Sequence, residues 1–309
     1  MIKILSPIDK INEVEQLIES GADEFFCGVL MGDDCYSSAR MTSRDKENIK
    51  NIDDLVVLAG KIKEREKNLF LAINRQLLKK EDIKKIKNSI DYLTEIGVDG
   101  FIVSNVDLLN AIKEKRIKLI ASSFFEAKNT ETVDFLKRFN IRRIILDRQI
   151  TEADINIIRK KFPDLEIEVF IMEAGCRSLD SYCNREIINK KKGAESHTCL
   201  ADFNVHDNDN VISQNQAKVI SERLKLPYPT CGICALPVFK KYHIDSVKIV
   251  GRGISSERKI RNVKFVKSAV NILHDHTIRD KQKAFKDLYI KMFGFNCHEK
   301  YCYFPHLKQ

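Results

Sequence analysis

The chain of 309 residues contains no tryptophan and little glycine or proline, with 12 Gly and 6 Pro. That is about half the usual share of these two residues, so a collagen-like or low-complexity protein is excluded. No apolar run reaches the roughly 18 residues that a membrane-spanning helix needs. The opening segment MIKILSPIDK reaches charged residues too early for a secretory signal, so we expect a cytoplasmic protein.

Familiar catalytic motifs are also missing from the chain. The sequence has no HExxH, no GxSxG and no GxGxxG after its first apolar stretch. These absences argue against the common zinc and serine hydrolases and against a dinucleotide-binding fold. Hydrophobic residues make up 43% of the chain, which is enough to bury a sizeable core.

The charge balance is basic, with 53 Lys and Arg against 44 Asp and Glu, a net charge of +9. This excess favours an anionic partner, which includes nucleic acid, a phosphorylated or carboxylated substrate, or an acidic protein. Many of the lysines lie on predicted helical faces, where a solvated surface is the other interpretation.

Apolar, β-rich stretches alternate with amphipathic helical patterns along most of the chain. This alternation predicts a (β/α)8 TIM-barrel-like fold over residues 1–279. A cysteine-rich insertion at 173–245 follows the seventh strand, and a C-terminal helix with a CxxxxC tail occupies 280–309. The expected strands are Ile2–Leu5, Asp23–Val29, Asn68–Ile73, Asp99–Ser104, Lys118–Phe125, Arg142–Leu146, Glu166–Met172 and Ser246–Val250.

Nine cysteines occur in a chain without a secretory signal, which favours metal or redox chemistry over a disulfide framework. Cys176, Cys183, Cys199 and Cys231 gather in the predicted insertion, separated by 6, 15 and 31 residues. Four thiolates suit tetrahedral zinc or an iron–sulfur cluster. The spacing by itself does not choose between these metals, and buried inert thiols remain the alternative interpretation.

The other cysteines have more than one interpretation. Cys234 is the alternative to Cys231 as a fourth ligand, and Cys27 alternates within an apolar strand, so we expect it in the core. Cys297 and Cys302 flank His298, and they form either a second metal or redox pair or an inert pair.

The segment EVFIMEAGCRSLDSYC at 168–183 resembles the signature of the peptidase U32 family. The segment CGICALPVFKKYHIDSVKIVGR at 231–252 resembles the second block of that family, in which a cysteine lies 17 residues before a lysine. That interval favours Cys231 over Cys234. The stretches GADEFFCGV, NLFLAIN, GVDGFIVSN and RRIILDRQIT are similar to further blocks in the same order, so the resemblance covers about residues 1–260.

The resemblance implies a barrel-like fold and a [4Fe–4S] cluster on Cys176, Cys183, Cys199 and Cys231. It also implies oxygen-independent hydroxylation, or a related redox transfer, on a small organic or RNA substrate in a low-oxygen setting. Prephenate is the implied oxygen donor in some members. Other members are described as peptidases, and some small ones work with a homologous partner chain. The alternatives are therefore a peptidase acting on a peptide or its precursor, or a non-catalytic iron–sulfur partner in a heteromeric complex.

Four residues depart from the family pattern. Met172 and Glu173 stand where His-Gly is usual, Ser181 replaces a glycine, and Val250 replaces an acidic residue. These departures indicate a divergent branch, so the substrate of any one member does not transfer directly.

Polar residues at the predicted strand ends are the site candidates, because the C-terminal ends of barrel strands carry the chemistry. Arginines there bind carboxylates through two hydrogen bonds, which suits a dicarboxylate such as prephenate. The competing interpretation is a set of salt bridges that close the barrel rim. The catalytic candidates are Arg148, Glu173 and Arg252, and the substrate-binding candidates are Asn74, Ser122, Ser123, Glu126 and Asp147.

Overall fold

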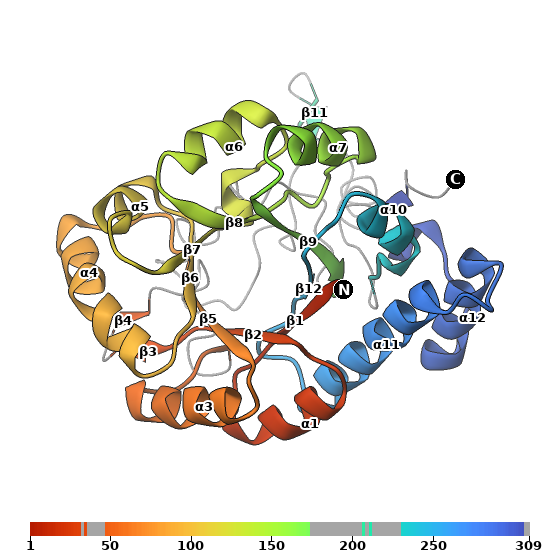
Figure 1. Cartoon of the computed structure of the whole chain (residues 1–309), viewed down its shortest axis with the longest axis horizontal. Coiled ribbons are helices and arrows are strands. Elements are labelled where there is room, and N and C mark those ends of the chain that lie inside the picture. Colours follow the sequence, from red (N-terminus) through yellow and green to blue (C-terminus); the bar gives the residue numbers. More distant parts are fainter. Residues whose placement is uncertain (32–33, 36–46, 174–205, 208–209, 212–229, 306–309) are drawn as a thin grey trace.

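The computed structural model describes residues 1–31, 34–35, 47–173, 206–207, 210–211 and 230–305. Three of the four predicted cluster ligands, Cys176, Cys183 and Cys199, lie outside the described residues. Eight parallel strands close into a barrel with helices around it (Figure 1). The predicted (β/α)8 architecture is confirmed.

The barrel strands are hydrogen-bonded in the closed order β1-β12-β9-β8-β7-β6-β5-β2. Their bounds are β1 (Lys3–Pro7), β2 (Glu24–Cys27), β5 (Asn68–Ile73), β6 (Gly100–Val103), β7 (Lys118–Ala121), β8 (Ile141–Ile145), β9 (Glu166–Met172) and β12 (Ser246–Ile249). Two short antiparallel pairs lie outside the barrel, β3 (Leu30–Met31) with β4 (Asp34–Cys35), and β10 (His206–Asp207) with β11 (Asn210–Val211).

Helices form the outer layer of the barrel (Figure 1). The α-helices are α1 (Val14–Glu19), α3 (Ile52–Glu64), α4 (Lys80–Glu95), α5 (Val106–Ile112), α6 (Thr130–Lys137), α7 (Glu152–Lys161), α10 (Leu236–Lys241), α11 (Ser256–His274) and α12 (Lys281–Phe293). The single-turn 3-10 helices are η1 (Ile11–Glu13), η3 (Ser123–Phe125), η7 (Ile233–Ala235) and η8 (Glu299–Tyr301). None of the helices among these described residues combines the length and apolarity that a membrane crossing needs.

Local sequence sets where several helices begin. The side chains of Asn51, Asn105 and Asn129 accept hydrogen bonds from the first turns of α3, α5 and α6. Thr151 and Asp154 form a reciprocal capping box at the start of α7. Each side chain satisfies a backbone N–H that has no partner within the helix, which fixes the point where the chain leaves a strand and turns into its helix.

All eight predicted strands are present, and those over Asn68–Ile73 and Glu166–Met172 match residue for residue. The stretch expected to run from Lys118 to Phe125 is the main difference, since β7 ends at Ala121. Ser122 accepts a hydrogen bond from the Phe124 N–H and starts the 3-10 turn η3. A serine that captures a nearby backbone N–H competes with strand pairing, and that local bond ends the strand.

The C-terminal tail packs onto the barrel. Cys302 forms an isolated parallel bridge with Cys231. The Cys231 N–H donates to the Tyr301 carbonyl at 2.8 Å, and the Tyr303 N–H donates to the Cys231 carbonyl at 2.9 Å. Tyr303 and Phe304 are buried. The tail therefore contributes side chains to the region around Cys231.

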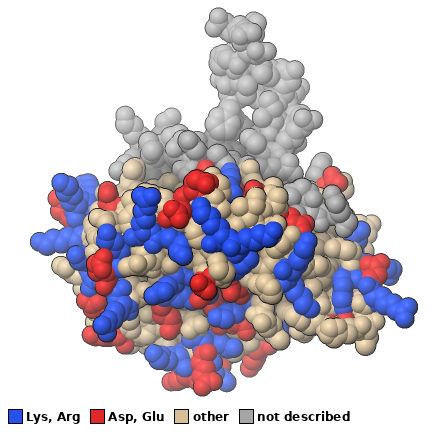
Figure 2. Space-filling view, turned by 45° about the horizontal axis from the view of Figure 1, so that its top comes forward, with Lys and Arg blue, Asp and Glu red and all other residues tan. Residues whose placement is uncertain are grey.

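The surface charge is mixed. Figure 2 shows Lys and Arg side chains interspersed with Asp and Glu over the visible face of the described residues. Many of these charges are solvated, as the dispersed lysine pattern of the sequence predicts.

Candidate active site

The barrel gathers the polar strand-end residues on one face. All eight strands are parallel, so their C-terminal ends lie together. Asn74, Ser122 and Glu173 directly follow β5, β7 and β9, and Asp147 lies two residues beyond β8. Ser104, predicted as the last residue of a strand, directly follows β6.

Alternation along the strands shows which of these side chains face the barrel interior. The Arg143 side chain of β8 reaches Glu24 of β2, a strand that is not its neighbour, so Arg143 points inward. Side chains two and four residues apart on a strand share a face. Asp147, four residues after Arg143, therefore lies on the inward face at the barrel mouth.

The same alternation applies to three neighbouring strands. Lys118 of β7 lies over the Phe70 ring, with its ammonium 5.5 Å from the ring centroid. A Cβ on Gly100 of β6 would lie 3.3 Å from the same ring. These three residues face the interior together, and the residues four positions further on are Asn74, Ser104 and Ser122. With Asp147, they form what we call the inward row of the barrel mouth.

The other side of the mouth is cationic and aromatic. Lys248 of β12 lies over the Phe26 ring, 4.1 Å from its centroid, and its ammonium is 3.0 Å from Glu168 Oε1. Burial lowers the pKa of Lys248, although Glu168 opposes that shift. The Arg252 guanidinium lies 6.0 Å from the Phe26 ring centroid and donates to Asn48 Oδ1 at 3.3 Å. These cations are placed to attract an anionic group into the mouth.

A buried ionic cluster fixes the turn that carries Arg252. The Lys259 ammonium lies 2.6 Å from Asp9 Oδ1 and 2.9 Å from Glu13 Oε2, and all three residues are buried. The Gly253 N–H donates to the other oxygen of Asp9. Gly253 adopts a positive φ of 82°, a conformation that glycine reaches without steric cost. The cluster thereby sets the path of the loop after β12.

Arg148 is held by stacking and by the tail. Its guanidinium lies 3.8 Å from the Phe170 ring centroid and donates to the Tyr303 hydroxyl at 2.9 Å. That hydroxyl in turn donates to the Glu173 carbonyl. The role of Tyr303 could not be inferred from the sequence, because nothing local connects a residue so near the C-terminus to β8 and β9.

Glu173 is a rim residue whose carboxylate is fully engaged. Arg258 donates to its two oxygens at 2.8 and 2.7 Å, and Asn262 donates at 2.6 Å. Its backbone φ is +68°, a left-handed conformation that is uncommon outside glycine. These contacts position Glu173 at the end of β9, and its catalytic role stays a prediction.

The remaining predicted residues lie around β7 and β8. Asp147 accepts the Gln149 N–H at 2.7 Å and lies 3.5 Å from the Lys128 ammonium. Ser122 is buried as the cap of η3, Ser123 is buried within it, and Glu126 follows at a positive φ of 48°. Ser122, Ser123 and Glu126 are close together in the chain after β7, whereas Asp147 follows β8. Ser122 and Asp147 both belong to the inward row.

Cys231 lies against the end of β9. It forms an antiparallel bridge with Met172, and the Glu173 N–H donates to the Thr230 carbonyl at 2.9 Å. Burial raises the pKa of Cys231 well above its usual value, and the nearby Cys297, Cys234 and Cys302 thiols add to that shift.

Among the residues that the structure describes, no group of three or more His, Cys, Asp or Glu side chains is placed to hold a metal ion. Cys27 is fully buried, as expected, and burial raises its pKa to about 12. Cys231 lies within the described residues and the other three predicted ligands lie outside them, and all four remain predictions.

Comparison with known proteins identifies the family. A family profile described as Peptidase family U32 matches residues 9–306. The chain belongs to this family. A solved structure titled "The Structure of the U32 Peptidase Mk0906" aligns with a TM-score of 0.54 at 10% identity, covering 81% of this chain and 93% of that one. At that identity the likeness supports the fold alone.

Two curated relatives from different organisms extend the comparison. The chain is 25% identical over 307 residues to "Uncharacterized protease MJ0090" of Methanocaldococcus jannaschii, covering 95% of this chain and 71% of the relative. It is 24% identical over 259 residues to "tRNA hydroxylation protein P" of Escherichia coli, covering 81% of this chain and 54% of that protein. This chain therefore spans about half the length of the tRNA hydroxylation relative.

Proposed function

We propose that this U32 protein is an iron–sulfur enzyme that hydroxylates a base in RNA without using molecular oxygen. In this proposal Cys176, Cys183, Cys199 and Cys231 hold a [4Fe–4S] cluster. The observation that carries the proposal is the position of Cys231, buried against the end of β9 beside the barrel mouth. The tRNA hydroxylation relative supports RNA as the substrate class.

When bound, the cluster would supply single-electron redox chemistry. The chain's own residues would bind and orient the reactants. Lys248 and Arg252 would attract anionic groups of the RNA, or the carboxylates of an oxygen donor such as prephenate. Arg148, fixed by Phe170 and Tyr303, would hold a second carboxylate at a defined position on the rim.

A peptidase is the second candidate, because the family name and the relative from Methanocaldococcus jannaschii carry that description. Peptide hydrolysis by a serine or cysteine needs a general base beside the nucleophile. Among the described residues, His243 precedes β12, and His274 and His276 lie at or beyond the end of α11, away from the strand-end serines. His206 lies in β10, and His298 directly follows Cys297 in the tail. The hydroxylase is placed first because of the tRNA hydroxylation relative.

The test uses full-length protein purified without oxygen, an unmodified tRNA transcript, a chemical reductant for the cluster, and prephenate, which as donor of an oxygen atom is also the two-electron oxidant of the base. The proposal predicts nucleosides that have gained one oxygen atom, detected by mass spectrometry after digestion. Cys231→Ser should abolish the product, while Cys234→Ser should retain it. Peptide cleavage that persists in Cys231→Ser, with no oxidised nucleoside from the wild type, would favour the peptidase.

A further inference from the structure

Two buried polar atoms at the barrel mouth have no hydrogen-bond partner among the described residues. They are Oδ1 of Asn74, after β5, and Oγ of Ser104, after β6. Ser104 is only 8% exposed. Most buried polar atoms in folded proteins are paired, and an unpaired one costs free energy. Unpaired atoms that face a barrel mouth indicate a place where a ligand completes the hydrogen bonds.

The two residues are neighbours in space. Ile73 pairs with Val103 in the β5–β6 ladder, so Asn74 and Ser104 occupy the next position in register. Beyond the ladder, the Asn105 side chain donates to the Gln76 carbonyl at 2.8 Å and keeps the two segments together. Because both residues belong to the inward row, the Asn74 carbonyl and the Ser104 hydroxyl face the same space.

The closed strand order places this pair across the mouth from the cationic side. β6 is four strands from β12 in either direction around the barrel, so Ser104 lies opposite the strand of Lys248 and its loop residue Arg252. β5 is likewise four strands from β9, which carries Phe170. A ligand that spans the mouth would meet neutral hydrogen-bonding groups at one end and cations at the other.

The chemistry of the pair defines what that ligand presents. Oδ1 of an asparagine only accepts hydrogen bonds, so it needs an N–H or O–H donor, whereas a serine hydroxyl can donate to a carbonyl. A ring N–H beside a carbonyl, as in uracil or guanine, offers this pair of groups along one edge. A phosphate on the same nucleotide suits the cations opposite.

We propose that Asn74 and Ser104 bind the N–H/C=O edge of a nucleobase, uracil or guanine, whose phosphate lies toward Lys248 and Arg252. The choice of a nucleotide rests on the RNA substrate proposed above. The role of Asn74 and Ser104 as ligand-binding residues rests only on their position and their unpaired atoms.

Nucleotide binding tests the recognition directly, with calorimetry on the full-length protein purified without oxygen. UMP or GMP should bind about tenfold more tightly than CMP and AMP, which lack a ring N–H beside a carbonyl. Asn74→Ala should weaken binding of the preferred nucleotide about tenfold. Methylation of the ring nitrogen of that nucleotide should weaken its binding to the wild type by a similar factor.

The methylated nucleotide should bind wild type and Asn74→Ala equally weakly, because both changes remove the same hydrogen bond. Equal affinities for all four nucleotides, or an unchanged affinity in Asn74→Ala, would overturn the proposal.

Thermal unfolding gives a second test that needs no ligand. Ser104→Ala should leave the unfolding temperature unchanged or raise it, because the hydroxyl forms no hydrogen bond with the residues that the structure describes. Ser246→Ala is the matched control, since the Ser246 hydroxyl is buried and donates to Glu24 Oε2 at 3.1 Å, and it should lower the temperature. If Ser104→Ala lowers the unfolding temperature as much as Ser246→Ala does, the Ser104 hydroxyl stabilises the fold and the proposal is overturned.

The outcomes separate this proposal from the proposed function. If nucleotide binding depends on Asn74 but the protein holds no iron and hydroxylates no RNA, the proposed function is wrong and the binding site stands. Hydroxylation of RNA that is unchanged in Asn74→Ala and Ser104→Ala would retain the function and overturn this site.

Discussion

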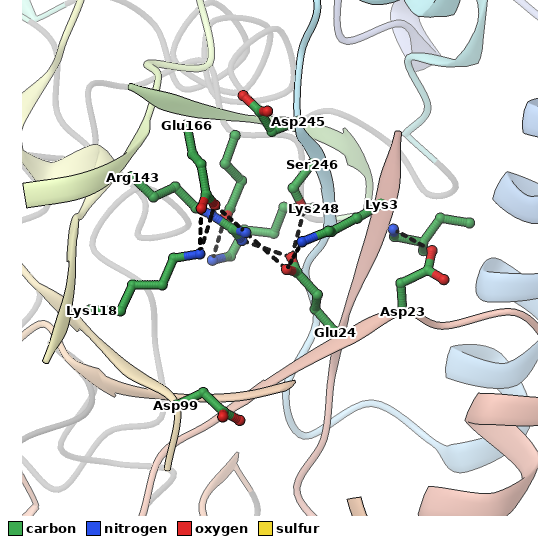
Figure 3. Close-up of polar contacts among 12 residues, drawn as sticks. Lys3, Asp23, Glu24, Asp99, Lys118, Arg143, Glu166, Asp245, Ser246 and Lys248 are labelled. Atoms are coloured by element: carbon green, nitrogen blue, oxygen red, sulfur yellow. Dashed lines mark hydrogen bonds and ion pairs between the residues drawn. The ribbon is translucent and has the colours of Figure 1, made fainter. Parts of the chain in front are cut away.

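Arg143 of β8 reaches across the inside of the barrel to Glu24 of β2, with its two terminal nitrogens 2.7 and 2.8 Å from the two carboxylate oxygens (Figure 3). Both side chains are fully buried. Arg143 also contacts Glu166 and Glu168 of β9. A single guanidinium thus joins non-neighbouring strands, and its charge is balanced by carboxylates inside the barrel.

Removing one partner of this pair should destabilise the barrel strongly. Arg143→Met leaves Glu24 buried without its guanidinium, and such a loss typically costs about 3–5 kcal/mol of unfolding free energy. Urea denaturation measures the change. Asp287→Asn is the control, because its ion pair with Lys283 on α12 is exposed and should contribute little measurable stability. Equal effects of the two substitutions would contradict the assigned importance of the buried network.

The same network predicts how stability depends on pH. Burial would raise the pKa of Glu24, but the hydrogen bond and charge of Arg143 outweigh it and lower the pKa below its usual 4.5. The pKa of Glu166 is also lowered, since the contacts with Lys118 and Arg143 outweigh burial.

A carboxylate with a lowered folded pKa contributes stability that is fully present above the unfolded pKa and is lost as the pH falls through the folded value. Unfolding temperatures should therefore drop below about pH 4.5, and Glu24→Gln should flatten that drop. An acid profile that is unchanged in Glu24→Gln would contradict the assignment.

Tyr303 should link the tail to the candidate site. Tyr303→Phe removes the hydroxyl that contacts Arg148 and the Glu173 carbonyl, which should cost about 1 kcal/mol in unfolding free energy. It should also weaken binding of a carboxylate ligand such as prephenate, because Arg148 loses a fixed partner. Tyr92→Phe, at a residue that is 49% exposed on α4, is the control and should change neither quantity. If Tyr303→Phe does not change the affinity for prephenate, the tail does not contribute to ligand binding at the candidate site.

Arg252 should recognise the anionic part of a nucleotide. Arg252→Ala should weaken UMP binding about tenfold while leaving uridine unchanged, because only UMP carries the phosphate. Arg65→Ala, at the end of α3 where Arg65 pairs with Glu15, serves as a charge-matched control. Calorimetric titration of both ligands makes the comparison. Equal losses for UMP and uridine would indicate a structural role for Arg252.

The sequence predicted the barrel well because its strands are short, apolar and separated by amphipathic helices. It also placed Asn74, Ser122 and Asp147 at strand ends, and the structure puts them in one inward row. Ser104 was treated as part of a strand, since periodicity alone does not show that its hydroxyl lacks a partner. The Arg143–Glu24 pair was not predictable either, because 119 residues separate its members and only barrel closure brings them together.

Cysteine spacing and family resemblance selected Cys231, and the structure places it against β9. Neither showed that Cys297 and Cys302 of the tail lie near it, because that contact depends on the tail packing against Cys231. The contacts of Tyr303 with Arg148 and Glu173 depend on the same packing of the tail. Long-range packing of the chain's last residues decides these contacts, and local sequence carries no signal for it.

The iron and acid-labile sulfide content of protein purified without oxygen tests the central claim most directly. The account predicts about four iron and four sulfide per chain, lost in Cys231→Ser and in a Cys176→Ser/Cys183→Ser double variant but retained in Cys234→Ser. Zinc without sulfide, or a cluster that survives in Cys231→Ser and is lost in Cys234→Ser, would contradict the proposed ligand set.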